Sequence, residues 1–307
     1  MIPVTSADVQ LLTAQVLWAV FSLAFALGVL VRQTHFCTMG AVADIVNLGD
    51  WSRMRMWALA AGVMVLGFNL MVALGWVQAE HTLYGGPRWL WASALVGGLM
   101  FGFGMVLGSG CGSKTLVRIG GGNLKSLVVL VVMGLTAWAS LRGMLAVLRV
   151  QTLDKVVLLL PVSQDLPSLL SHATGGEVPV ALWALGCAVL VGGGLMAWAL
   201  SRVEGRHSEV LLGGLGVGVL GVLLWWVSGR LGFVPEHPET LEPTFLGTAS
   251  QRMEAFAFTA PIAQLLEWWV FYSDSSRHLS VGVVAVLGVT LGSAFTSVTR
   301  GQFRWEG

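Results

Sequence analysis

Long apolar runs without a charged residue dominate the chain. A helix needs roughly 20 apolar residues to cross the hydrocarbon core of a bilayer. Runs of that length cover residues 11–31, 56–79, 89–113, 178–201, 210–229 and 279–299, and a seventh, 124–149, carries basic residues only near its ends. The runs are continuous rather than alternating, and backbone amides cannot stay unpaired in lipid. The pattern therefore predicts spanning helices rather than a barrel.

The composition supports a membrane environment. Of the 307 residues, 55% are hydrophobic and 11% are charged, with a mean hydropathy of +0.78, whereas a soluble domain carries about 25% charged residues. Seventeen basic and sixteen acidic residues leave a net charge of +1, which gives no electrostatic footprint for nucleic acid. We expect an all-α polytopic membrane protein with about seven spanning helices, whose main partner is the lipid bilayer.

A polar connection at residues 151–178, with two prolines and a glycine pair, divides the chain into roughly equal parts. It predicts a first membrane repeat at 1–150, which holds both cysteine motifs, and a second at 179–307. If the N-terminus lies outside, ten of the seventeen basic residues fall on the cytoplasmic side, as the positive-inside rule favours. These ten are Arg32, Arg53, Arg55, Lys114, Arg118, Lys125, Arg202, Arg206, Arg300 and Arg304.

Two further segments have a helical pattern but are too short to span. They cover about 35–48 and about 253–272, precede full spans, and contain Gly40 and Pro261 as breaks. Short apolar segments at corresponding places in two halves indicate re-entrant half-helices of an inverted-repeat transporter. The alternative is a pair of amphipathic helices lying on the membrane interface.

The densest glycine run of the chain ends in a cysteine. Its four-residue spacings predict a smooth helix face for close packing, at Gly98, Gly102, Gly104 and Gly108. Gly110 and Gly112 flank Cys111 and predict an unwound segment, which membrane depth tolerates only inside protein or beside a cavity. Amides at the start of the next helix, with Lys114 and Arg118 nearby, would form an anion site. An ordinary interfacial loop is the alternative.

The two cysteine motifs resemble signatures of one family. Residues 35–44, His-Phe-Cys-Thr-Met-Gly-Ala-Val-Ala-Asp, are similar to the first signature of the YeeE/YedE family, and residues 102–112, Gly-Phe-Gly-Met-Val-Leu-Gly-Ser-Gly-Cys-Gly, to its second. The resemblance extends from about residue 20 to the end of the chain. It implies a multi-pass permease of the bacterial inner membrane rather than an enzyme, with pseudo-repeated halves, no cofactor, and thiosulfate or a related small sulfur anion as substrate. A small cytoplasmic sulfur-carrier protein is an implied partner.

The resemblance also implies the residues of a narrow substrate path. Its cysteines correspond to Cys37 and Cys111, and the motif positions beside them are Thr38, Gly40, Gly110, Gly112 and Lys114. A dianion leaves water at great cost unless other donors replace that water. Neutral thiols would accompany the soft sulfur as weak donors, whereas thiolates would repel the dianion. Helix-end amides and the lysine would offset charge on the oxygen side, in weak sequential sites.

One departure concerns the end of the sequence. Family members continue past a segment similar to residues 303–307, Phe-Arg-Trp-Glu-Gly, into a hairpin with a third Gly-Cys motif. The sequence stops at Gly307, so we expect an incomplete second repeat, which would be either a truncated version or a protein with a shorter pathway. Cys187 does not match the third motif and is expected to be a packing residue. The counterpart of the Cys37 region in the second half is Phe258-Thr-Ala-Pro261, which has no thiol.

Two other functions fit some of these residues. A membrane-embedded metal or redox protein would use His35, Cys37 and Cys111, but a soft-metal site needs several converging ligands, and the spacing predicts no metal site. A membrane scaffold that transports nothing is the other possibility. Four carboxylates receive structural interpretations: capping or orientation of short helices for Asp44 and Asp50, and solvation or pairing for Glu254 and Glu267.

Overall fold

The computed structural model describes residues 6–274 and 279–307. Its α-helices are α1 Ser6–Thr34, α2 Thr38–Leu48, α3 Ser52–Ala73, α4 Trp91–Leu107, α5 Gly112–Gly120, α6 Leu124–Arg142, α7 Met144–Gln151, α8 Leu166–Ala173, α9 Val180–Cys187, α10 Gly194–Leu200, α11 Ser208–Trp226, α12 Thr259–Val270 and α13 Val281–Thr299. Four short strands, β1 Arg88–Trp89, β2 Leu158–Leu159, β3 Phe233–Val234 and β4 Thr244–Phe245, form two antiparallel ribbons, β1–β2 and β3–β4. The fold is helical, as predicted.

Within the described ranges, seven helical stretches are long and apolar enough to cross a membrane, which confirms the predicted number. They are Ser6–Leu48, Ser52–Ala73, Trp91–Gly120, Leu124–Arg142, Val180–Leu200, Ser208–Leu231 and Val281–Thr299. The span Val180–Leu200 joins α9 to α10 through a π-helical turn, Ala188–Gly193. The apolar run at 124–149 is divided, because Gly143 ends α6 and begins the separate helix α7.

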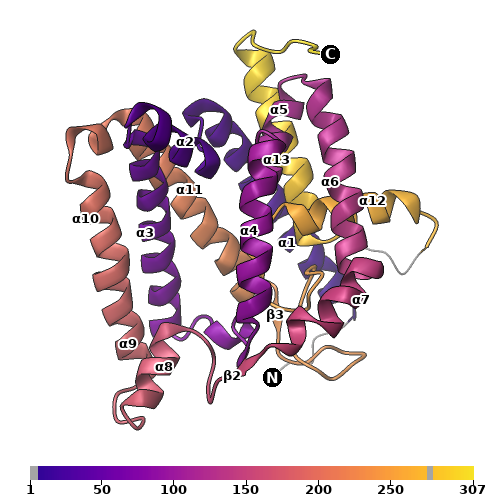
Figure 1. Cartoon of the computed structure of the whole chain (residues 1–307). Helices are drawn as coiled ribbons and strands as arrows, with labels where there is room; N and C mark the ends of the chain where they lie inside the picture. Colours follow the sequence, from indigo (N-terminus) through magenta and orange to yellow (C-terminus); the bar gives the residue numbers. More distant parts are fainter. Residues whose placement is uncertain (1–5, 275–278) are drawn as a thin grey trace.

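Helix α1 lies at the centre of the bundle. It packs against α13 on one side and α11 on the other, while α3 packs on α11 and the α9–α10 span packs on α3 (Figure 1). Helices α5 and α12 pack on α13, and α6 packs on both α5 and α12. The main hydrophobic core joins α1, α5, α11, α12 and α13 through buried side chains such as Val16, Val20, Leu116, Ile262 and Val286.

Glycines let α1 and α13 approach to backbone contact. A Cβ atom on Gly292 would lie 2.1 Å from the carbonyl oxygen of Phe25, and one on Gly28 would lie 2.2 Å from that of Val289. No side chain fits at either position. Gly288, four residues before Gly292, meets α1 in the same way, so α13 carries the small-residue spacing that supports helix contact in membranes.

Helix α4 departs from the packing expectation. None of the residues in its most apolar window is buried, and a Cβ atom on Gly98, Gly102 or Gly104 would meet nothing within 4 Å among the described residues. The predicted packing face therefore has no partner among the described residues, and its packing stays a prediction. The spacing showed that one face is smooth, but the spacing alone does not say which helix is covered.

The two ends of the bundle differ. The N-terminal end of α1, β2 and α8 lie at the lower end in Figure 1, whereas α2, α5 and the C-terminus lie at the upper end. The C-terminal segment is tied to the turn between α5 and α6, because the amide of Arg304 donates to Gly121 O (3.2 Å) and the amide of Leu124 donates to Glu306 O (2.9 Å). The helices on the α11 side of α1 (α3, α9, α10 and α11) and those on its α13 side (α5, α6, α12 and α13) each include elements from before and after residues 151–178. That connection holds a short helical turn at Leu153–Lys155, β2 and α8. The repeat boundaries stay a prediction.

Candidate substrate path

Cys37 caps a short helix at the upper end of the bundle. Helix α1 ends at Thr34, and His35 takes a left-handed conformation (φ 52°) that turns the chain before α2 begins at Thr38. The amide of Gly40 donates a hydrogen bond to Cys37 Sγ at 3.4 Å. The half-buried thiol therefore lies at the positive end of an 11-residue helix, where free amides favour anions. Thr38 is exposed at the first turn.

Carboxylates anchor α2 to the start of α3. Asp44 Oδ2 lies 3.0 Å from Arg53 Nε, and a Cβ atom on Gly40 would lie 2.7 Å from Arg53 Nη1. Asp50 accepts from the amide of Ser52 (2.9 Å) and from its hydroxyl (2.6 Å). Those two bonds hold the pKa of Asp50 below its ordinary value of 3.8. Both carboxylates thus orient short helices.

Cys111 lies in a true interruption between α4 and α5. Helix α4 ends at Leu107, Ser109 is left-handed (φ 55°), and α5 begins at Gly112. Cys111 Sγ lies 3.1 Å from Ser113 Oγ, and the hydroxyl of Thr115 donates to Cys111 O at 3.0 Å. Lys114 folds its aliphatic stem against Gly110, since a Cβ atom there would lie 2.8 Å from Lys114 Cδ. The motif thus ends at the N-terminus of α5.

The N-terminus of α5 meets the start of α12 inside the bundle. A Cβ atom on the buried Gly112 would lie 3.2 Å from Phe258 Cβ and 3.5 Å from Ile262 Cδ1. Pro261 packs against Gly282 near the start of α13. Of the second short segment, predicted at about 253–272, only Thr259–Val270 is helical. The first turn of this helix lies beside the Cys111 motif.

Two polar carboxylates behave as interpreted from the sequence. Glu267, which is 7% exposed on α12, pairs with Arg142 of α6 at 2.8 Å. Glu254 accepts hydrogen bonds from the amide and hydroxyl of Ser250. Both pairs hold the segment that leads into and through α12.

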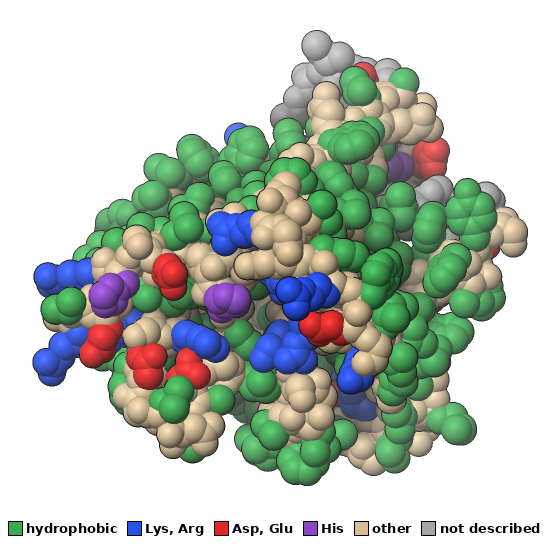
Figure 2. Space-filling view, turned by 90° about the horizontal axis from the view of Figure 1, so that it is seen from above, with side chains coloured by type: hydrophobic (Ala, Val, Ile, Leu, Met, Phe, Trp, Pro, Cys, Tyr) green, Lys and Arg blue, Asp and Glu red, His purple; other side chains and the backbone are tan. Residues whose placement is uncertain are grey.

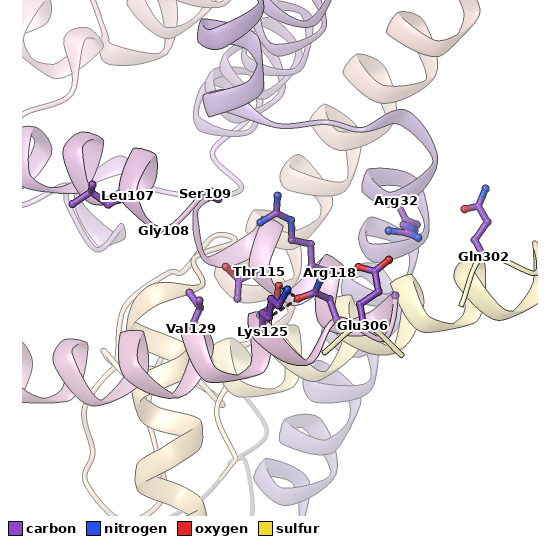
Figure 3. Close-up of a pocket in the computed structure, with 13 residues that line it drawn as sticks. Arg32, Leu107, Gly108, Ser109, Thr115, Arg118, Lys125, Val129, Gln302 and Glu306 are labelled. Atoms are coloured by element: carbon purple, nitrogen blue, oxygen red, sulfur yellow. Dashed lines mark hydrogen bonds between the residues drawn. The ribbon is translucent and has the colours of Figure 1, made fainter. Parts of the chain in front are cut away.

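A cavity of about 530 Å³ opens beside the Cys111 motif (Figure 3). Ser109 and Thr115 line one side, and Arg32, Arg118 and Lys125 supply positive charge. Seen from the upper end, Lys and Arg side chains gather around a hollow (Figure 2). A second cavity of about 420 Å³ lies beside the Cys37 turn, lined among others by Thr34, His35, Asp50, Arg53, His207 and Glu209.

The structure groups the sequence-predicted residues into two clusters. Cys37, Thr38 and Gly40 lie at the start of α2, and Gly110, Cys111, Gly112 and Lys114 lie at the start of α5. Among the described residues, no hydrogen bond joins the two thiols. Arg32 and Lys125 were assigned only an orientation role by sequence. The available signal is that Arg32 directly follows an apolar run and that Lys125 lies three residues after the glycine turn 120–122.

Comparison with known proteins identifies the family. The chain matches the family model described as sulphur transport over residues 33–307. It belongs to that family. The match confirms the YeeE/YedE resemblance and shows a transport protein of the membrane rather than an enzyme.

Two similar relatives carry the same printed name. The thiosulfate transporter TsuA of Escherichia coli (strain K12) is 24% identical over 293 residues, which cover 91% of this chain and 74% of the relative. The thiosulfate transporter TsuA of Spirochaeta thermophila is 25% identical over 128 residues, which cover 41% of this chain and 37% of the relative. Membership and relatives together make this chain a sulphur-transport protein that spans the membrane several times.

Proposed function

We propose that this protein carries thiosulfate across the bacterial inner membrane along a path that passes Cys37 and Cys111. The observation that carries the proposal is the contact of Gly112 with Phe258 and Ile262, because it places the break between α4 and α5 against the start of α12 inside the bundle. Interrupted helices at membrane depth are tolerated where they are buried in protein or line a cavity. The printed names of both relatives support thiosulfate as the substrate.

The chemistry of the two cysteine clusters suits a soft dianion. Helix N-termini α2 and α5 offer free amides to the oxygen end of the anion. An ordinary cysteine thiol is mainly protonated at neutral pH, so it contacts the terminal sulfur without charge repulsion. Lys114, packed on Gly110, adds a positive charge at the Cys111 break. Each contact is weak, which favours passage over retention.

The basic end of the bundle supports an orientation of the protein in the membrane. Arg32, Arg118 and Lys125 surround the cavity beside α5 at the end that also holds the C-terminus, and the positive-inside rule places such an end in the cytoplasm. Thiosulfate would then leave the path near Cys111 and become available to a cytoplasmic sulfur-carrier protein. Labelling of single cysteines introduced at Leu83 and Lys125 by a membrane-impermeant maleimide tests this orientation.

Uptake of radiolabelled thiosulfate tests the function. Cells lacking their own thiosulfate uptake would express the wild type, Cys37→Ala, Cys111→Ala and the control Cys187→Ala, with membrane levels matched. We expect uptake to fall at least about tenfold for the first two variants, equivalent to about 1.4 kcal/mol or more, and to stay near wild type for the control. Full uptake by both cysteine variants would refute the thiol path.

A further inference from the structure

The cavity beside α5 carries more positive charge than its surroundings neutralise. Arg32, Arg118 and Lys125 line it, and Glu306 is its one acidic lining residue. None of the three cations has a carboxylate within 4.0 Å among the described residues. Unpaired cations around a concave surface raise the local concentration of anions.

Arg32 is held ready for a ligand. Its Nε atom is buried and has no hydrogen-bond partner among the described residues. The guanidinium lies beside Gly121, where a Cβ atom would be 3.3 Å from Nη1 and 3.4 Å from Nη2. A buried donor without a partner is destabilising, so Arg32 keeps hydrogen-bonding capacity that the described residues do not use.

Glu306 lines the same cavity but forms no ion pair with the cations that the structure describes there. Asn123 Nδ2 donates to Glu306 Oε2 at 3.0 Å, and the backbone of Glu306 is fixed by Gly122 O (3.1 Å) and by the amide of Leu124 (2.9 Å). Its carboxylate projects between the side chains of Arg118 and Arg32 (Figure 3). The amide of Asn123 thus holds a negative group near the cations but outside ion-pair distance.

We infer that this cavity is a binding site for a soluble tetrahedral oxyanion with two charges, and that Glu306 is an internal competitor for it. The anion is bound by Arg32, Arg118 and Lys125, and the Glu306 carboxylate lowers its affinity by repulsion. Two arginine forks suit sulfate-like oxygens, and no thiol lines the cavity. Sulfate and thiosulfate therefore bind here alike, and the resident carboxylate keeps the site weak enough to release its ligand.

The identity of the transported anion rests on the proposed function, but the oxyanion site does not. Ser109 and Thr115 join the cavity to the Cys111 break, so the cavity lies at one end of the proposed path. Cys111→Ala should lower uptake at least about tenfold and leave binding in the cavity intact. Normal uptake by Cys111→Ala would refute the thiol path alone, whereas normal binding by the arginine variants would refute the cavity site alone.

Direct binding of radiolabelled thiosulfate, with unlabelled sulfate as competitor, tests the inference. The full chain is placed in nanodiscs of phosphatidylcholine at low ionic strength, as wild type, Arg32→Gln, Arg118→Gln and Arg202→Gln. The last removes an exposed positive charge outside the cavity. We expect Kd to rise about tenfold or more for the first two variants, since each loses a charge-assisted hydrogen bond, and to stay unchanged for Arg202→Gln. Equal effects of all three, or failure of sulfate to compete, would overturn the site.

Glu306→Gln separates the competitor from a structural role. Glutamine keeps an oxygen that accepts from Asn123, so the fold is retained while the charge is lost. We expect Kd to fall about threefold or more, because a like charge is removed from beside the dianion, and unchanged or weaker binding would overturn the competitor role. Nanodiscs containing phosphatidylglycerol distinguish the source of the anion. Thiosulfate binding that persists there supports a soluble ligand, and its loss would assign the cavity to a lipid phosphate instead.

Discussion

The contact between α1 and α13 gives the sharpest test of how the fold positions the cysteine motif. A Cβ atom on Gly292 would lie 2.1 Å from the carbonyl oxygen of Phe25. The same helix holds α5 in place, because the hydroxyl of Ser293 donates to Val117 O at 2.7 Å. Gly292→Ala adds one methyl group at this crossing. Gly102→Ala adds the same group on α4, where nothing lies within 4 Å.

The size of the effect follows from the overlap. Carbon and oxygen atoms in close helix contacts lie about 3.3 Å apart or more, so the alanine at 292 requires α1 and α13 to separate by about 1 Å. A gap of about 0.5–1 Å loses a quarter to a half of the dispersion attraction across it. Overpacking in a tight core typically costs about 1–3 kcal/mol. Because most of α13 is buried, we expect Gly292→Ala to lower the free energy of unfolding by about 3 kcal/mol, the upper end of that range.

Thermal unfolding in detergent, followed by intrinsic tryptophan fluorescence, measures the difference. All samples are heated at one scan rate, because unfolding of such proteins is commonly irreversible. We expect the apparent Tm of Gly292→Ala to fall by about 5 °C or more and that of Gly102→Ala to stay within about 2 °C of wild type. Equal Tm values for the two variants would refute the crossing as described.

Three further changes test the surroundings of the site. Arg142→Gln removes the arginine that pairs with Glu267. We expect the free energy of unfolding to fall by about 1–2 kcal/mol, because the carboxylate is buried whereas the half-exposed arginine weakens the pair. Adding Glu267→Gln to this variant should recover part of the lost Tm. The depressed pKa of Asp50 favours the ionised carboxylate in the folded protein. Its contribution to the free energy of unfolding is therefore complete above about pH 4 and lost in more acidic solution. In denaturant titrations, Asp50→Asn should show a smaller fall in stability below that pH than the wild type. Gly112→Leu should lower thiosulfate uptake about tenfold or more, because its side chain collides with Phe258, and unchanged uptake would count against that contact.

Much of the fold follows from the sequence because lipid restricts the choices. A charge-free run such as 279–299 has few alternatives to a spanning helix, and α13 appears there. Packing partners are harder to predict. Glycines at 288 and 292 and glycines at 98 and 102 have the same four-residue spacing, yet only the first pair contacts another helix within the described chain. Spacing defines a smooth face, whereas contact depends on distant residues such as Phe25.

The local part of the candidate site was also accessible from sequence. Glycine on both sides of Cys111 predicts the interruption, and Ser109 and Gly110 carry it out. The approach of Phe258 to Gly112 depends on tertiary structure across more than a hundred residues, so no local pattern indicates it. The grouping of Arg32 with Arg118 arises in the same way, since one follows a span and the other precedes a glycine turn.

Protection of the thiols by substrate tests the central claim most directly. Purified protein in lipid nanodiscs is alkylated with N-ethylmaleimide with and without thiosulfate at constant ionic strength, and mass spectrometry reads the rate at each cysteine. If Cys37 and Cys111 contact the passing anion, thiosulfate should slow alkylation of both by about threefold or more and leave Cys187 unchanged. Identical rates at Cys37 and Cys111 with and without thiosulfate would contradict the account.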